Sequence, residues 1–145
     1  MNENNELLMH IYKVCDMGAL STTKLLNTLK NKENKIKTIL SEELKKYEEF
    51  YKECNKLLKK NSISPKGTNI ITRISSDIGI KMETIKDNSD ASIASMLIEG
   101  FTMGNTEMMM KIDKYKSICN KKVIKLSKEI IKFQECEIEK LKAYM

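Results

Sequence analysis

The sequence predicts an all-α protein: a four-helix bundle of two antiparallel hairpins, with one additional crossover helix. Hydrophobic residues recur every three or four positions through most of the chain, which places them on one face of a helix. Pro occurs once and Gly five times among 145 residues, so turn-rich β structure is disfavoured. The breaks between periodic segments are short and polar, as expected within a single helical-bundle domain spanning residues 1–145.

The first two predicted helices span residues 5–30 and 33–60 and form an antiparallel hairpin. Each carries a seam of residues that faces its neighbours, with small or polar residues near the middle. The seam of the first helix contains Leu8, Ile11, Cys15, Gly18, Thr22, Leu25 and Leu29. The seam of the second contains Ile36, Leu40, Glu43, Tyr47, Phe50, Cys54 and Leu57. Because Leu would pack best at such positions, a carboxylate there indicates a site that the bundle has kept or lost.

The third predicted helix, residues 65–86, decides the topology. Ser64 and Pro65 suit the N-cap and the first helical position. Ile residues then recur by three and four, which favours a helix over a strand. About 20 residues at 1.5 Å each span about 30 Å, enough to return the chain along the bundle. The second and fourth helices would then be parallel.

The fourth and fifth predicted helices, residues 90–115 and 119–144, form the second hairpin, and Ser89 can cap its start. The fourth seam contains Ile93, Met96, Leu97, Gly100, Met103, Gly104, Met108 and Ile112. The fifth contains Cys119, Val123, Leu126, Ile130, Phe133, Glu137 and Leu141. Since Gly costs about 1 kcal/mol in a helix relative to Ala, Gly100 and Gly104 predict the close approach of another backbone.

Several short strings carry a family resemblance that spans nearly the whole chain. They are Leu44-Lys45-Lys46-Tyr47, Ser64-Pro65-Lys66, Ile98-Glu99-Gly100-Phe101-Thr102-Met103-Gly104 and Phe133-Gln134-Glu135-Cys136-Glu137-Ile138-Glu139. Together with the helix pattern they resemble small uncharacterised bacterial members of the ferritin-like four-helix-bundle superfamily. Metal-binding members resemble one another in two Glu-x-x-His motifs, and this chain has none. The resemblance therefore implies a ferritin-like bundle without a conventional di-iron centre, in which His10, the only histidine, is no iron ligand.

Three acidic residues are the candidate metal ligands. Counting along the proposed hairpins places Glu43, Glu99 and Glu137 at about the same height, near mid-bundle. Oxygen ligands suit a hard cation, so Mn, Fe or Mg are the possible metals, although the principal expectation is no cofactor. Two other interpretations stay open: the remnant of a lost site, or boundary positions at which Glu99 and one other Glu face water.

The cysteines and the N-terminus favour a cytoplasmic protein. Cys15, Cys54, Cys119 and Cys136 form no Cys-x-x-Cys pair and are expected to be small buried hydrophobes, with a disulfide or a thiolate metal site as alternatives. The first residues have no basic and apolar pattern of a signal peptide, and no apolar stretch approaches the length that a bilayer requires. We therefore expect no membrane association.

The net charge of +6 comes almost entirely from lysine, because Arg73 is the only arginine among 26 basic residues. Base recognition favours the bidentate guanidinium, and many Lys alternate with Glu as on solvated helix faces. Nucleic acid is thus not the expected partner, although a Lys-based polyanion binder is one alternative function.

The expected function is non-catalytic. No Ser, Cys or Lys lies beside a histidine at a spacing known for nucleophilic catalysis, so we assign no catalytic residues. Met96, Met103 and Met108-Met109-Met110 either fill core gaps or form an adaptable surface for a partner. The sequence therefore favours a bundle that acts through protein contacts, most simply as a homodimer, with divalent-metal binding as an alternative.

Overall fold

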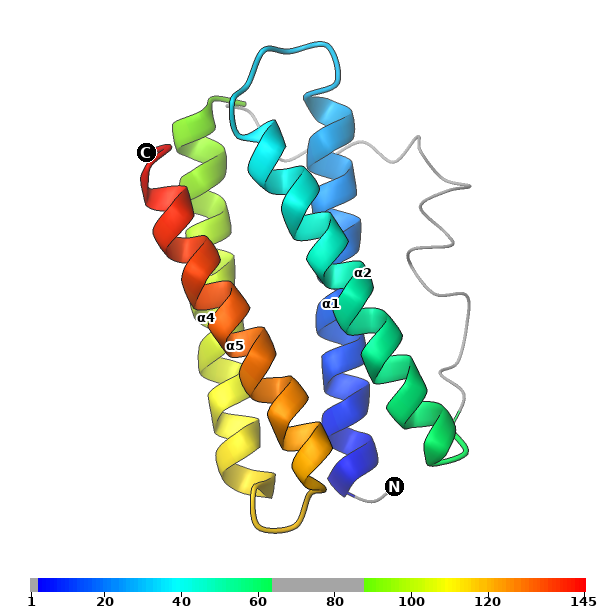
Figure 1. Ribbon diagram of the computed structural model, residues 1–145. Coiled ribbons are helices and arrows are strands. Elements are labelled where there is room, and N and C mark those ends of the chain that lie inside the picture. The colour runs from blue at the N-terminus through cyan, green and yellow to red at the C-terminus, as the bar shows by residue number, and fades with distance from the viewer. Residues whose placement is uncertain (1–2, 64–87) are drawn as a thin grey trace.

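The computed structural model describes residues 3–63 and 88–145 (Figure 1). This part of the chain is all-α, as predicted, and contains α1 (Glu3–Thr28), α2 (Lys37–Lys60), α4 (Asp90–Tyr115) and α5 (Lys121–Lys142). The crossover helix predicted for residues 65–86 lies outside the described residues and stays a prediction.

The four helices form two hairpins that pack together. α1 and α2 run antiparallel and make one hairpin, and α4 and α5 make the other. α2 and α5 lie beside each other at the front of Figure 1, with α1 and α4 behind them. α2 and α4 point in the same direction, which agrees with the topology expected from the sequence.

Local polar groups set where the helices begin. Ser89 caps α4, since its side chain accepts a hydrogen bond from the Ser92 amide at 3.2 Å, as predicted. Asn120 caps α5 by accepting from the Lys122 amide at 2.8 Å. α2 begins at Lys37, later than expected, and Ile36 at its N-cap offers no capping side chain. The carboxylate of Asp90, from the other hairpin, instead holds the backbone just before the helix, because it accepts from the amides of Lys35 and Ile36.

Side-chain hydrogen bonds join the hairpins at both ends of the bundle. At one end, the Asn34 amide donates to the Asn88 carbonyl at 2.7 Å and to Asp90 at 2.9 Å. At the other end, the Tyr115 hydroxyl donates to Glu6 and the Asn120 amide donates to Asn4. These bonds fix the height of each hairpin against the other, and therefore the residues that can meet at mid-bundle.

An aromatic cluster centred on Phe133 fills the middle of the core. The Phe133 ring lies edge-on to Tyr47 and Phe50 of α2, at centroid distances of 5.6 and 5.5 Å. Phe101 of α4 approaches it at 6.2 Å. One residue of α5 thus contacts both α2 and α4, in the geometry that aromatic quadrupoles favour.

The predicted seams are correct for three helices and only partly correct for α4, where Ile93, Met108 and Ile112 are buried but Met96, Gly100 and Met103 are exposed. The seams of α1, α2 and α5 are buried except for their partly buried members Gly18, Leu57 and Cys119. In α4 the buried stripe instead contains Ile93, Ala94, Phe101, Asn105, Met108, Ile112 and Tyr115. No described residue lies within 4 Å of a Cβ added at Gly100, so the predicted close approach of another backbone is wrong for this part of the chain. The large rings of Phe101 and Tyr115 take the inward positions because they bury more apolar area than Met or Gly.

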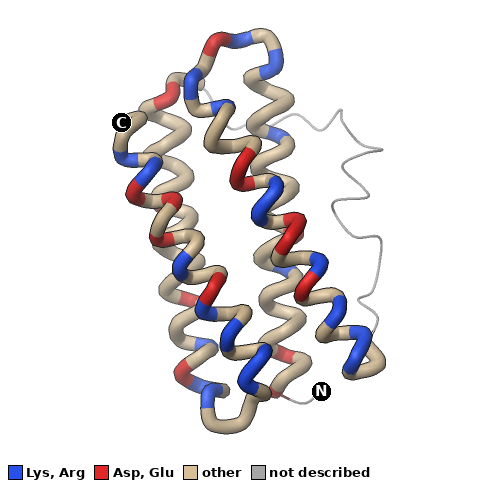
Figure 2. The backbone as a smooth tube through the Cα atoms, in the orientation of Figure 1, with Lys and Arg blue, Asp and Glu red and all other residues tan. Residues whose placement is uncertain are grey.

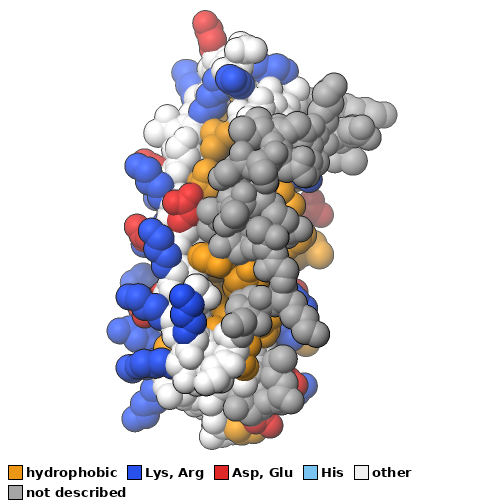
Figure 3. Space-filling view, turned by 90° about the vertical axis from the view of Figure 1, so that its right-hand side faces the viewer, with side chains coloured by type: hydrophobic (Ala, Val, Ile, Leu, Met, Phe, Trp, Pro, Cys, Tyr) orange, Lys and Arg blue, Asp and Glu red, His pale blue; other side chains and the backbone are white. Residues whose placement is uncertain are grey.

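Charge and hydrophobicity are distributed unequally over the surface. Charged residues of both signs are interspersed along α2 and α5 (Figure 2), and most of them are exposed. On the side formed by α1 and α2, hydrophobic side chains gather in a long band (Figure 3). A search of the described helices finds none whose length and apolar character would allow it to cross a bilayer.

Candidate functional site

Two of the three predicted acidic residues meet inside the bundle. Glu43 of α2 and Glu137 of α5 are buried, with 0% and 3% of their surface exposed. Their carboxyl groups lie close enough to interact electrostatically, and a protonated Glu43 can share its proton with Glu137. Glu99 of α4 is exposed and does not join them. The structure thus contains a buried carboxyl pair, Glu43 and Glu137, in place of the predicted group of three.

Burial makes the neutral form of Glu43 the stable one at pH 7. Desolvation, followed by the negative charge of Glu137, raises the pKa of Glu43 from 4.5 to about 9. Among the described residues, neither carboxyl oxygen of Glu43 accepts a hydrogen bond. The protonated form can donate to Glu137, and Glu137 in turn lies 3.4 Å from the Lys140 Nζ. The three groups together can therefore be electrically neutral, which reduces the cost of burying them.

Tyr47 packs beside the carboxyl pair, one helical turn after Glu43. Burial, together with the nearby charge of Glu43, raises the pKa of the Tyr47 hydroxyl well above its usual value of 10. The ring covers Gly18 of α1, where an added Cβ would lie 2.3 Å from the tyrosine Cζ. The buried Thr22 hydroxyl donates to the Gly18 carbonyl at 2.7 Å, so this small-residue stretch of α1 has no orphaned hydroxyl.

Two buried amides that the sequence analysis missed lie nearby in α4 and α5. Asn105 and Gln134 are each 4% exposed, and neither side-chain oxygen has a hydrogen-bond partner in the part of the chain that the structure describes. Asn105 uses its amide nitrogen to donate to the Ile131 carbonyl at 3.4 Å, and the Gln134 amide lies against Gly104. The helical spacing indicates that both amides share a face with buried residues. Asn105 lies four residues after Phe101 and three before Met108, and Gln134 lies three residues before Glu137.

A surface groove between α2 and α5 leads to one side of the carboxyl pair. It has a volume of about 580 Å³, and its lining includes Phe50, Phe133, Glu137 and Lys140. Glu43 does not line it. Solvent can therefore approach Lys140 directly, whereas Glu137 borders the groove but is almost fully buried and Glu43 lies outside the lining.

The remaining polar candidates lie apart from the pair. His10 is partly buried, with Nδ1 4.0 Å from Glu107, and burial lowers its pKa. All four cysteines are free thiols. Cys15 and Cys54 are buried as expected, and desolvation raises both thiol pKa values, which makes them unreactive. Cys136 is exposed and Cys119 partly so, unlike the expected buried positions.

The donor set limits the chemistry that is possible. Within residues 3–63 and 88–145, no three or more His, Cys, Asp or Glu side chains are placed together to hold a metal ion. Metal binding by Glu43 and Glu137 would therefore need further oxygens from amides, water or a ligand. The chain matches no family model, no curated protein and no solved structure.

Proposed function

We propose that this protein is a ferritin-like bundle without a conventional di-iron centre, acting non-catalytically by pairing with a second copy through α4. The observation that carries the proposal is an apolar ridge on the outer face of α4. Met96, Gly100, Met103 and Met110 form this methionine ridge, and the three methionines are 38%, 68% and 69% exposed. They recur every seven residues, the spacing of a seam between two helices.

Gly100 supports the same surface for a separate reason. A glycine inside a helix costs about 1 kcal/mol relative to Ala, and no contact within the described chain offsets this cost. A glycine lets a second helix approach closely, and a flexible Met side chain adapts well to such a surface. An intermolecular contact would thus account for a residue that the isolated bundle does not require.

The charges beside the ridge suggest an antiparallel arrangement. When two copies of α4 cross at residue 105, Met110 of each copy lies level with Gly100 of the other. The same register places Glu99 level with Lys111 of the second copy, and the two-fold axis repeats this opposite-charge pair. Glu107 would lie near Met103 of the second copy, and it has its own neighbour, His10, at 4.0 Å.

A single helix face buries less area than the roughly 800 Å² per partner of a standard interface, so we expect a weak dimer with Kd on the order of micromolar. Static light scattering across a concentration series tests it. Met103→Glu should leave the protein monomeric, because the charge would be buried at the centre of the contact. Met145→Glu is the matched control, since Met145 is 65% exposed and lies outside the ridge. A wild-type protein that stays monomeric at millimolar concentration, or equal effects of the two variants, would contradict the proposal.

A second candidate function, divalent-cation binding, rests on the buried carboxyl pair. Among the described residues, both oxygens of Glu43 and one of Glu137 have no hydrogen-bond partner. Carboxylate oxygens are ligands that suit a hard cation. The cation would have to displace the proton of Glu43, so its affinity should rise with pH. Metal analysis of protein purified without chelator should then find Mn, Fe or Mg that Glu43→Gln removes. Glu42→Gln, at the exposed neighbouring position, should retain it. Equal metal content in both variants would exclude the pair as the site.

A further inference from the structure

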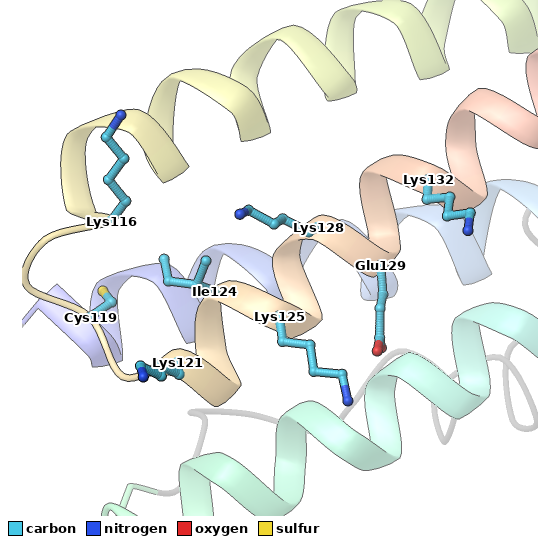
Figure 4. Close-up of a pocket in the computed structure, with 8 residues that line it drawn as sticks. All are labelled: Lys116, Cys119, Lys121, Ile124, Lys125, Lys128, Glu129 and Lys132. Atoms are coloured by element: carbon cyan, nitrogen blue, oxygen red, sulfur yellow. The ribbon is translucent and has the colours of Figure 1, made fainter.

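A second surface, independent of the methionine ridge, concentrates lysine around a groove at the start of α5. The groove has a volume of about 480 Å³ and lies where the α4–α5 turn meets α5 (Figure 4). Five lysines line it, and Glu129 is the one acidic residue in the lining. We call this the lysine groove; its lysines are Lys116, Lys121, Lys125, Lys128 and Lys132.

Most of these charges are uncompensated by the protein. Lys116 pairs with Asp113 at 3.0 Å. No ion pair within the described part of the chain involves Lys121, Lys125, Lys128 or Lys132. Elsewhere Lys46, Lys140 and Lys142 each pair with a Glu three residues away on their own helix. Lys52, Lys56 and Lys59 of α2 likewise form no ion pair with described residues, so the distinguishing feature of α5 is that its unpaired lysines line one groove.

The position of these lysines opposes the helix dipole. The N-terminal end of a helix carries partial positive charge and favours acidic residues. α5 instead has no acidic residue in its first turn, where Lys121 and Lys122 lie. The arrangement destabilises the helix when nothing is bound. An anion in the groove would reduce the repulsion between the lysines and interact favourably with the positive end of the helix dipole. The charge distribution is thus better suited to a bound anion than to the free protein.

The lining indicates the chemistry of the ligand. Among the described residues that line it there is no arginine and no aromatic ring, so they offer neither a bidentate fork for bases nor a stacking platform. From Lys121 to Lys132 the lysines recur by four, three and four along about 16 Å of helix. Lysines that recur along one helix beside a groove, without base-reading groups, match a row of phosphates. We propose that the lysine groove binds a linear phosphate chain, of which inorganic polyphosphate and a single-stranded nucleic-acid backbone are the two sources.

Fluorescence anisotropy with labelled polyphosphate and with a labelled single-stranded oligothymidine tests this proposal. The full-length protein should bind at least one probe at low salt, with affinity falling linearly in log–log form as salt rises. The probe bound more tightly identifies the source. In the triple variant Lys121→Gln/Lys125→Gln/Lys128→Gln, affinity should fall by at least about tenfold and the salt slope should decrease by about 2, for three lost contacts.

A matched variant separates a site from net charge. Lys52→Gln/Lys56→Gln/Lys59→Gln removes the same charge from exposed lysines of α2 and should bind like the wild type. Equal losses in the two triple variants would overturn the proposal, as would no binding of either probe at 50 mM salt. Exposed Ile118 in the α4–α5 turn makes vesicles of anionic phospholipid the decisive competitor. Lysine-dependent binding to vesicles without binding to either probe would also overturn it.

Discussion

The ring of Tyr47 lies directly on the backbone of Gly18. A Cβ at residue 18 would be 2.3 Å from the Tyr47 Cζ and 2.4 Å from Cε1, closer than packed atoms can approach. Tyr47 is 5% exposed and lies edge-on to Phe133, so its ring has little room to move. The glycine of α1 therefore allows the aromatic cluster and the carboxyl pair to occupy the same level of the bundle.

Gly18→Ala should destabilise the fold. The added methyl group displaces a ring that is packed against Phe133, and overpacking of this kind costs about 1–3 kcal/mol despite the better helix propensity of Ala. Urea unfolding followed by circular dichroism measures the change. The second-site substitution Tyr47→Leu, which removes the ring, should reduce the additional cost of Gly18→Ala to near zero. A Gly18→Ala protein as stable as the wild type would show that Tyr47 does not rest on this backbone.

Gly100→Ala should have the opposite effect on the monomer. In the described part of the chain nothing lies within 4 Å of the added Cβ, so the gain in helix propensity of up to about 1 kcal/mol is not offset by a clash there. Urea unfolding at a protein concentration well below the dimer Kd measures this gain. Gly100→Leu should leave monomer stability at or above that of the wild type yet weaken the dimer, because the ridge loses its point of close approach. A loss of stability in the dilute Gly100→Ala monomer would contradict the exposed position of Gly100.

The seams of α1, α2 and α5 could be predicted because their periodicity selects one stripe. In α2 and α5, Lys and Glu fill the positions between the apolar residues, so the buried face is clear from sequence. α4 has apolar residues on several faces, and Met96, Met103 and Met110 fit a three-four pattern as well as the buried residues do. Packing against Phe133 selects Phe101 instead, and a pattern within one helix does not contain that information.

For the acidic residues, the sequence predicted the height along the bundle but not the direction in which each side chain points. Counting residues from the turns gives the height of a side chain along the bundle, and this correctly brought Glu43 and Glu137 to one level. Height alone does not give the direction in which the side chain points. Glu99 precedes Phe101 by two residues, about 200° around the helix axis, so the inward position of Phe101 directs Glu99 outward.

The titration of Glu43 should make stability depend on pH. Its pKa of about 9 in the folded protein exceeds the ordinary value of 4.5, so the folded state binds a proton that the unfolded state releases. The stabilisation from this group is full below about pH 4.5 and is lost progressively as the pH rises towards 9. Glu43→Gln mimics the neutral form and should gain stability relative to the wild type as the pH rises from 5 to 9. Urea unfolding at several pH values measures this difference, with Glu42→Gln as the exposed control. A pH-independent difference would mean that Glu43 is ionised in the folded protein.

A charge exchange tests the antiparallel register of the proposed dimer. Glu99→Lys or Lys111→Glu alone would place like charges opposite each other twice across the two-fold axis, and each should weaken association severalfold at low salt. The double variant Glu99→Lys/Lys111→Glu restores opposite charges and should recover most of the wild-type Kd. Sedimentation equilibrium at two salt concentrations provides the measurement, because the effects of exposed pairs should shrink as salt increases. Glu48→Lys, on α2 outside the ridge, controls for the change in net charge. If both single variants associate more weakly and the double variant does not recover, this register is wrong but α4 remains the contact. If association is unchanged in all variants, the contact lies elsewhere.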